Sequence, residues 1–326
     1  MRSATKILVG RLSFVSLVVI LICYRGRSEN DSASSHFNVP TGQLEVPSTV
    51  PSSSDEFRTP GDGGGCPLSS SAPQGRSLQL DDLFSYESEW RSAPYNIFLQ
   101  ESSCNPKPSY RVWCAVESLA QQNPDALVWY IMTSPVADQS DDLAPSLTQI
   151  YKNLRVAKVD LKTVFSNTPL EDIYTAGLWR KNNTWPEINL ADIMRLAVVW
   201  KMGGLYADSD VVCIRQVTQL TNMIAWQEGF TLGSGVFHFS RHHPVLKLVM
   251  EYIKENFQPE KWGSSGPIVF TRILKDLCDV KDKKKRCLGV SLLPIRSFTR
   301  FLRSYGRLCS CPRTRGQLGR DTHRRT

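Results

Sequence analysis

Two acidic residues, Asp208 and Asp210, are separated only by Ser209 and follow a short apolar run. The run comes directly after Gly203–Gly204 and is typical of a β-strand, so the acids are expected at its end. Side chains two positions apart in a strand lean to the same side, where two like charges repel. A hard divalent cation, Mn²⁺ or Mg²⁺, relieves that repulsion by binding carboxylate oxygens together with the phosphate oxygens of a substrate. The pattern therefore predicts a metal–diphosphate site at the two acids.

The segment before the glycine pair, residues 189–204, is predicted to be a helix that begins at Asn189 and ends at Gly203. It is apolar on almost every side, which indicates a buried helix. Asp192 and Arg195 interrupt it and, being three residues apart, share a face. Buried charges are costly unless they are paired or used. Two interpretations stay open: an internal salt bridge that fixes the helix, or a polar stripe that faces a ligand.

Upstream of this helix, strand-like and helix-like segments alternate. Buried strands are predicted at 95–100, 126–132 and 156–161, with helices at 109–124 and around 147–154. This alternation predicts an α/β fold with a mostly parallel central sheet flanked by helices. In such sheets, ligands bind beyond the carboxyl ends of the strands. The fold prediction therefore agrees with a site at the end of the strand that precedes the two acids.

The net charge of +8 would suit a nucleic-acid-binding protein, but its distribution argues against one. Residues 296–326 contain nine Arg and a single Asp, which accounts for the whole excess. The rest of the chain is close to neutral and shows no basic stripe with interleaved aromatic residues. We therefore predict no nucleic-acid partner.

The N-terminus is predicted to be a membrane signal. Residues 1–27 contain an apolar run bounded by basic residues, which fits either a cleaved signal peptide or an uncleaved signal anchor. Arg25 and Arg27 follow the run at once, where cleavage favours small residues, so a single-pass type II anchor is favoured. Residues 28–78 are rich in Ser, Pro and Gly and are predicted to be a flexible stem. Glycosylation sequons at Asn30 and Asn182 fit a luminal chain.

The stretch "LADIMRLAVVWKMGGLYADSDVV" (190–212) resembles the DXD sugar-binding region of the alpha-1,4-glycosyltransferases of glycosyltransferase family 32. The likeness covers roughly residues 94–295, within a predicted single domain at 79–295. It implies a GT-A-like fold, a UDP-sugar donor and Mn²⁺ (or Mg²⁺). It also implies retaining transfer of galactose or N-acetylgalactosamine, in alpha-1,4 linkage, to a glycolipid or glycoprotein acceptor. The location it implies is the Golgi membrane, with a role in glycosphingolipid biosynthesis.

The resemblance also assigns roles to particular residues. A metal–diphosphate site falls on the two acids, and the residues implied in donor binding are Asp192, Arg195, Tyr206, Asp208 and Ser209. The acceptor-side candidates come from "LGSGVFHF" and "WGSSGP" and are Ser234, Gly235, Gly266 and Pro267. Ser234 stands where the family usually shows Asn. No catalytic base or nucleophile is assigned.

Nine cysteines fit an oxidising compartment, and two spacings predict small disulfide loops, Cys104/Cys114 and Cys278/Cys287. The likeness to the family is expected to end after residue 298, where residues 296–326 form a basic, atypical tail. That ending leaves two hypotheses besides an active transferase. One is a truncated, inactive member that binds UDP-sugar or a partner enzyme. The other is a binding module whose Asp-Ser-Asp is a simple turn.

Overall fold

The computed structural model describes residues 77–138, 143–181, 185–228, 231–278 and 286–294. The predicted anchor, nearly all of the predicted stem, the basic tail and both sequon asparagines lie outside these residues. Within the described part of the chain, no helix is long and apolar enough to cross a bilayer. The predicted boundaries of the anchor (1–27), the stem (28–78), the domain (79–295) and the tail (296–326) stay predictions.

Most strands in the described residues form one eight-stranded sheet in the order β5-β3-β2-β6-β8-β7-β10-β9, while β1 and β4 pair separately. In chain order the strands are β1 (Ser77–Gln79), β2 (Asn96–Glu101), β3 (Leu127–Met132), β4 (Val136–Asp138), β5 (Leu154–Lys158), β6 (Gly204–Ala207), β7 (Met223–Glu228), β8 (Thr231–Phe239), β9 (Arg286–Cys287) and β10 (Val290–Leu293). Strands β5, β3, β2 and β6 are parallel, and β7 and β10 are parallel too. The pairs β6–β8, β8–β7 and β10–β9 are antiparallel. The predicted mostly parallel sheet is confirmed.

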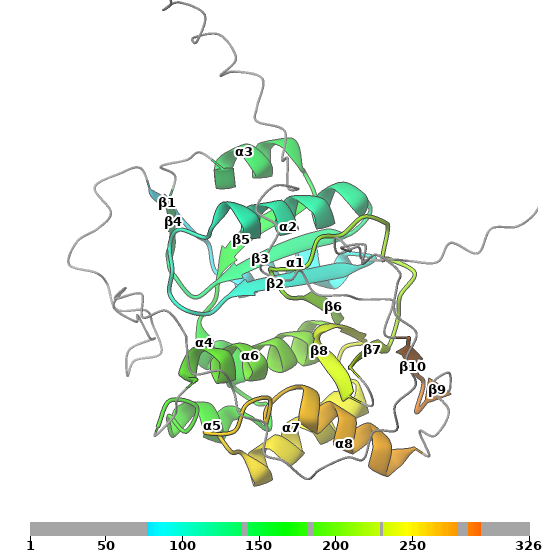
Figure 1. Ribbon diagram of the computed structural model, residues 1–326. Coiled ribbons are helices and arrows are strands. Elements are labelled where there is room, and N and C mark those ends of the chain that lie inside the picture. The colour runs from blue at the N-terminus through cyan, green and yellow to red at the C-terminus, as the bar shows by residue number, and fades with distance from the viewer. Residues whose placement is uncertain (1–76, 139–142, 182–184, 229–230, 279–285, 295–326) are drawn as a thin grey trace, which may run out of the picture.

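Helices cover both faces of this sheet, as Figure 1 shows. They are η1 (Leu83–Tyr86), α1 (Glu87–Ser92), α2 (Tyr110–Gln122), α3 (Leu143–Ile150), α4 (Leu161–Phe165), α5 (Glu171–Thr175), α6 (Pro186–Met202), α7 (Pro244–Asn256) and α8 (Pro267–Leu277). One apolar core joins α2 and α3 to one face of the sheet. The other core is larger and contains the buried side chains of α4 to α8. Burial of these two faces supplies most of the driving force for folding.

The predicted elements of the first half are confirmed as β2, β3 and α2, but the next two are displaced along the chain. Helix α3 ends at Ile150, about four residues earlier than predicted, and β5 begins at Leu154, two residues earlier than predicted. Asn153 explains the shift, because its side-chain amide donates to three carbonyls at the end of α2 and the start of β3. This anchors a turn within the segment that apolar spacing alone assigns to a helix.

Helix α6 differs from the prediction at its start and agrees with it at its end. It begins at Pro186, not at Asn189, because proline suits the first turn of a helix. Asn189 lies inside the helix and donates its side-chain amide to the carbonyl of Pro259 at 2.9 Å. Gly203 is the C-cap with φ of 71°, and a Cβ there would lie 2.7 Å from the backbone nitrogen of Arg241. Only glycine fits that turn into β6.

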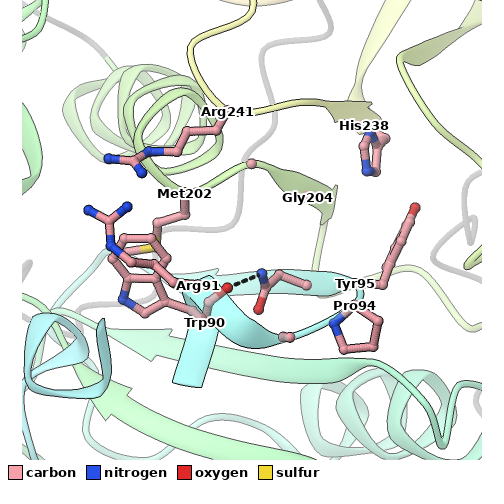
Figure 2. Close-up of a pocket in the computed structure, with 11 residues that line it drawn as sticks. Trp90, Arg91, Pro94, Tyr95, Met202, Gly204, His238 and Arg241 are labelled. Atoms are coloured by element: carbon pink, nitrogen blue, oxygen red, sulfur yellow. Dashed lines mark hydrogen bonds between the residues drawn. The ribbon is translucent and has the colours of Figure 1, made fainter. Parts of the chain in front are cut away.

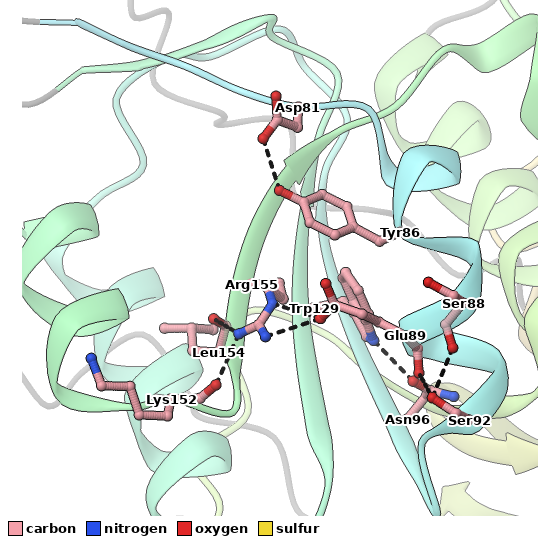
Figure 3. Close-up of polar contacts among 10 residues, drawn as sticks. All are labelled: Asp81, Tyr86, Ser88, Glu89, Ser92, Asn96, Trp129, Lys152, Leu154 and Arg155. Atoms are coloured by element: carbon pink, nitrogen blue, oxygen red, sulfur yellow. Dashed lines mark hydrogen bonds and ion pairs between the residues drawn. The ribbon is translucent and has the colours of Figure 1, made fainter.

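The chain before β2 is fastened to the sheet by a set of polar contacts, drawn in Figure 3. Arg155 on β5 donates to Glu89 on α1 at 3.0 Å, and the two groups form an ion pair. Trp129 on β3 donates its indole N–H to Asn96 at 2.9 Å. Asn96 in turn donates to the carbonyl of Trp90 at 2.8 Å. The bonds of Asn96 fix the position of the start of β2. Because the strand is rigid, they also fix the position of its carboxyl-terminal end, next to the predicted site.

The disulfide predicted between Cys104 and Cys114 is wrong. Cys104 is disulfide-bonded, whereas Cys114 is not in a disulfide. Cys114 lies on the face of α2 that packs toward the sheet, where it is 6% exposed, so its thiol belongs to the core. Cys278 is disulfide-bonded, while the side chain of Cys287 lies outside the described residues, so that loop stays a prediction.

Candidate functional site

The Asp-Ser-Asp segment follows β6 at once, at the carboxyl-terminal edge of the parallel half of the sheet. The register pairs Phe98 with Tyr206, so the last two residues of β2 run alongside the start of the Asp-Ser-Asp segment. The backbone N–H of Asp208 donates to the carbonyl of Gly235 on β8 at 2.8 Å, and the N–H of Val211 closes a turn onto the carbonyl of Asp208. The three residues of the segment are partly buried. The expected placement at a strand end is what the structure shows.

A cavity of ≈ 440 Å³ opens at this edge of the sheet. Its walls come from the ends of β2 and β6, from β3, from the segment before α2 and from α6. The lining residues are Gln100, Glu101, Ser102, Asn105, Pro108, Ser109, Val112, Tyr130, Ala191, Arg195, Tyr206, Asp208, Ser209 and Asp210. Four of the five donor-binding candidates are among them. Most of the residues that line the cavity have polar side chains, and the cavity lies where parallel sheets bind ligands.

Arg195 joins α6 to the Asp-Ser-Asp turn. One guanidinium nitrogen lies 2.9 Å from Asp208 Oδ1 and 3.0 Å from the carbonyl of Ser234, and the other lies 3.2 Å from Asp192 Oδ1. Burial opposes the charge, but Asp208 and the other neighbouring acids outweigh it and raise the pKa of Arg195. The internal salt bridge is therefore confirmed, and Arg195 also lines the cavity, while a stripe that faces a ligand stays a prediction. Asp192 is paired but does not line the cavity.

Tyr206 supports the same carboxylate from the strand side. Its hydroxyl donates to Asp208 Oδ1 at 2.9 Å, and the guanidinium of Arg195 lies 4.7 Å from its ring centroid. Burial raises the pKa of Tyr206 well above its usual value, and the Asp208 charge adds to this. The tyrosine thus stays a hydrogen-bond donor at any physiological pH. One oxygen of Asp208 is held by two donors, which fixes the orientation of the carboxylate.

The acceptor-side candidates lie against the part of α6 that carries Asp192 and Arg195. A Cβ on Gly266 would lie 2.8 Å from Ser234 Oγ and 3.0 Å from Asp192 Oδ2, so the backbone there approaches both side chains closely. Pro267 is the first residue of α8. The structure therefore brings Ser234, Gly235 and Gly266 together with Asp192 and Arg195. None of the four acceptor-side candidates lines the cavity itself.

Among the cavity residues that were not singled out from the sequence, Glu101 and Tyr130 are ionisable groups deep in the cavity wall. Glu101 is the last residue of β2, and burial raises the pKa of its carboxyl, although hydrogen bonds from Ser103 and Asn105 partly offset the effect. Tyr130 on β3 is fully buried, and its hydroxyl has no hydrogen-bond partner among the described residues. The acid that ends the run "NIFLQE" was a usable signal, because it follows a buried strand as Asp208 does. No comparable signal marks Tyr130.

A second cavity, of ≈ 300 Å³, lies at the opposite ends of the same strands (Figure 2). Asn96 and Gly204, which begin β2 and β6, line it together with Arg91, Arg241 and His238. It contains none of the predicted site residues. The amino ends of parallel strands are not where these sheets usually bind ligands, so the first cavity is the stronger candidate.

The donor set of the first cavity can be tested against the expected metal. Within the described residues, no group of three or more His, Cys, Asp and Glu side chains could hold a metal ion. Asp208 and Asp210 supply oxygen donors only, and one oxygen of Asp208 is already held by Arg195 and Tyr206. This set fits Mn²⁺ or Mg²⁺ bound by one or two carboxylates together with the phosphates of a ligand. It does not fit a metal held by protein groups alone.

The Asp-x-Asp segment thus follows a strand of an α/β fold and lies in the wall of a cavity, and comparison with known families identifies the class of protein in which this arrangement occurs. Residues 109–231 match the glycosyltransferase sugar-binding region containing a DXD motif. Residues 238–305 match the alpha 1,4-glycosyltransferase conserved region. The second match runs past residue 298, where we expected the likeness to end, so that expectation was wrong.

Comparison with individual curated proteins shows which glycosyltransferases the chain is similar to. Mouse lactosylceramide 4-alpha-galactosyltransferase is 32% identical over 215 residues, which are 64% of this chain and 59% of the relative. The orangutan protein of the same name (Pongo pygmaeus) is 32% identical over 154 residues, 45% of this chain and 68% of the relative. Human alpha-1,4-N-acetylglucosaminyltransferase is 33% identical over 211 residues, 62% of this chain and 61% of the relative. The chain belongs to the alpha-1,4-glycosyltransferase family. It spans about three fifths of the length of most of these relatives.

Solved structures with a similar arrangement include the PaToxG glycosyltransferase, at 16% identity and a TM-score of 0.42 over 62% of this chain and 78% of that one. The bacterial N-acetylglucosamine transferase NleB is another, at 10% identity and a TM-score of 0.34 over 61% and 88%. Similarity at this level carries no information about the site.

Proposed function

We propose that the chain is a metal-dependent, retaining hexosyltransferase that moves galactose or N-acetylgalactosamine from a UDP-sugar, in alpha-1,4 linkage, to a glycolipid or glycoprotein acceptor. In the reaction the bond between the anomeric carbon and the diphosphate breaks, a bond from that carbon to an acceptor hydroxyl oxygen forms, and UDP and the hydroxyl proton are released. The observation that carries the proposal is the position of Asp208 and Asp210, at a strand end and in the wall of the cavity. Family membership supports the same chemistry.

The two acids suit a diphosphate only with a cation present, because carboxylates and phosphates repel. When bound, Mn²⁺ or Mg²⁺ would neutralise the charge that develops on the leaving diphosphate. The contribution of the chain is orientation. Arg195 and Tyr206 both bind Asp208 Oδ1 and so leave its second oxygen in a fixed direction. A site held in place before the ligand arrives loses little entropy on binding.

The cavity wall also offers groups for the nucleoside. Gln100, Ser102 and Tyr130 line it with an amide and two hydroxyls. The hydroxyl of Tyr130 is buried and has no partner in the described part of the chain, and such a group costs stability unless a ligand satisfies it. We propose that the uridine of the donor lies here, with Tyr130 as one of its hydrogen-bond partners.

The cellular setting belongs to the same proposal. We propose that residues 1–27 anchor the chain as a single-pass type II protein in the Golgi membrane, with the stem, the domain and the sequons in the lumen. The relatives named above act on lactosylceramide or transfer N-acetylglucosamine, according to their names. A glycolipid acceptor is therefore the first to test, and glycosphingolipid biosynthesis is the process proposed.

The test uses the purified full chain in detergent, with lactosylceramide and either UDP-galactose, UDP-N-acetylgalactosamine or UDP-N-acetylglucosamine. Mass spectrometry of the lipid reports transfer, with Mn²⁺ present or chelated. We expect one donor to give a product that needs the cation and that is lost in Asp210→Asn. Asp276→Asn is the matched control, because Asp276 is an exposed acid of α8 in an i,i+4 ion pair.

The outcomes separate the hypotheses. Cation-dependent UDP binding without transfer to glycolipid or glycoprotein acceptors would favour the inactive member that binds UDP-sugar. Absence of both binding and transfer would contradict the proposal and favour a simple turn at the two acids.

A further inference from the structure

The loop between α7 and α8 exposes a tryptophan beside the candidate site. All eight tryptophans of the chain lie in the described residues, and Trp262, at 59% exposed, is the only one of them that is exposed. Its ring meets that of Trp185, at the start of α6, edge to face with centroids 5.2 Å apart. An exposed tryptophan forfeits the large gain from burying its ring, so its position calls for a reason.

The loop that carries Trp262 is not loosely held. The Asn189 side chain of α6 donates to the carbonyl of Pro259 at 2.9 Å, and Ser265 Oγ donates to Asn189 Oδ1 at 3.0 Å. Ser265 is fully buried, and its hydroxyl also lies 3.4 Å from Asp192 Oδ2. The loop is thus fastened to α6 on both sides of Trp262. The exposure of the ring is therefore a property of an ordered loop.

The two tryptophans lie next to the proposed site. Gly266, four residues after Trp262, packs against Asp192 and Ser234, which are the direct neighbours of Arg195. On the other side, Glu187 lies two residues after Trp185. Burial raises the pKa of Glu187 first, and the charge of Glu101 in the cavity wall raises it further. The aromatic pair therefore lies at the N-terminal end of α6, the helix that also supplies Ala191 and Arg195 to the cavity wall.

We propose that Trp262, braced by Trp185, is the platform on which a sugar ring of the acceptor stacks, an inference that rests on the proposed transferase function. A hexopyranose presents C–H groups on one face and hydroxyls around its edge. The flat indole of Trp262 packs against the C–H face of the sugar ring. Glu187, which is half-buried, and Lys261, which is exposed, are polar partners for the hydroxyls at its edge. A ring stacked here would lie beside the cavity that holds the donor. Trp262 is thus a positioning residue for the acceptor.

The test compares the full chain with Trp262→Ala, Trp262→Phe and Ile150→Ala. Ile150, at the end of α3, is as exposed as Trp262 and lies on the opposite face of the sheet, so it is the matched control. Saturation-transfer NMR with lactose, in the presence of UDP and Mn²⁺, detects sugar contact without turnover. Acceptor KM with lactose, in an assay for the transfer product, gives the second readout. Calorimetric UDP affinity shows that each variant folds with its donor site intact.

We expect saturation transfer to the C–H face of one lactose ring in the wild type and its loss in Trp262→Ala. Acceptor KM should rise about tenfold in Trp262→Ala and much less in Trp262→Phe, with UDP affinity unchanged. Ile150→Ala should match the wild type in every readout. Equal lactose contacts in Trp262→Ala, or none in a wild type that binds UDP, would overturn the platform. A wild type that does not bind UDP would instead contradict the proposed function. Calorimetry detects that failure independently of the lactose contacts seen by NMR, so the two failures can be told apart.

Discussion

The guanidinium of Arg195 lies 2.9 Å from the carboxylate of Asp208, so a buried cation on α6 is tied to the first acid of the Asp-Ser-Asp turn. The same guanidinium lies 3.2 Å from Asp192. One arginine thus compensates two carboxylates, one structural and one in the cavity wall. The stability of the fold and the orientation of the Asp208 carboxylate therefore depend on the same residue.

Replacing Arg195 by Met should cost about 3–5 kcal/mol of unfolding free energy, because removal of one partner leaves buried charge uncompensated. Chemical denaturation at neutral pH measures the loss. Arg91→Ala is the control: Arg91 forms an exposed i,i+4 ion pair with Glu87, and such pairs contribute about 0.3–0.5 kcal/mol. A small and similar change in both variants would show that the Arg195 network carries no special weight.

Replacing Tyr130 by Phe should have opposite effects on stability and binding. The hydroxyl is buried and has no hydrogen-bond partner within the described residues, so its removal should leave the stability unchanged or raise it by about 1 kcal/mol. If the donor nucleotide satisfies that hydroxyl, UDP affinity should fall about fivefold or more, the equivalent of about 1 kcal/mol. Denaturation and calorimetry on the same preparation give both values. Unchanged UDP affinity would remove Tyr130 from the donor site.

Gly266 should tolerate no side chain while Ser234 keeps its hydroxyl. A Cβ at Gly266 would lie 2.8 Å from Ser234 Oγ, so Gly266→Ala should cost about 1–3 kcal/mol through overpacking. Ser234→Ala removes the oxygen that clashes. The double variant should therefore recover part of the loss, although Asp192 Oδ2, at 3.0 Å, still crowds the methyl group. Strictly additive costs in the double-mutant cycle would contradict the contact.

The sequence was informative where local chemistry decides the structure. Gly203 ends α6 and the acids end β6, because a positive φ and a strand-end turn are properties of a few consecutive residues. The start of α6 was misplaced because Asn189, a plausible cap, instead bonds Pro259, which lies seventy residues away. Cys114 was misassigned because the number of residues between two cysteines does not show whether a thiol is buried in the core. These errors share one cause, the contact of residues that are distant in sequence.

The same cause limited the prediction of the site. Asp208, Ser209, Asp210 and Arg195 were found from a local pattern and a family resemblance, and the structure places them around one cavity. Tyr130 could not be found, because it sits in an apolar strand whose neighbours give no polar signal. Tyr130 becomes a candidate for ligand binding only in the structure. There it lines the cavity, and its buried hydroxyl has no hydrogen-bond partner among the described residues.

Acid should destabilise the fold through His238. Burial lowers its pKa to about 4 from the ordinary 6.5, and its neutral Nδ1 accepts the backbone N–H of Asn222 at 3.1 Å. The unfolded chain therefore binds this proton more readily than the folded one. The stability is fully present above pH 6.5 and is lost as the pH falls toward about 4, a change of about 3 kcal/mol.

Denaturation curves between pH 4 and 7 measure that slope. His238→Gln should flatten it in part, since the pKa values of His242 and His243 are also lowered by burial and their titration remains. An identical slope in the variant would show that His238 is not the group responsible.

The most direct test of the account is a calorimetric titration of the full chain with UDP, with and without Mn²⁺, in the wild type and in Asp210→Asn. Because no group of described side chains could hold a metal alone, Mn²⁺ by itself should bind weakly, and UDP should bind tightly only with the cation present. Asp210→Asn should abolish that cation dependence. UDP affinity that is equal with and without Mn²⁺ in the wild type, or unchanged by Asp210→Asn, would contradict a metal–diphosphate site at Asp208 and Asp210.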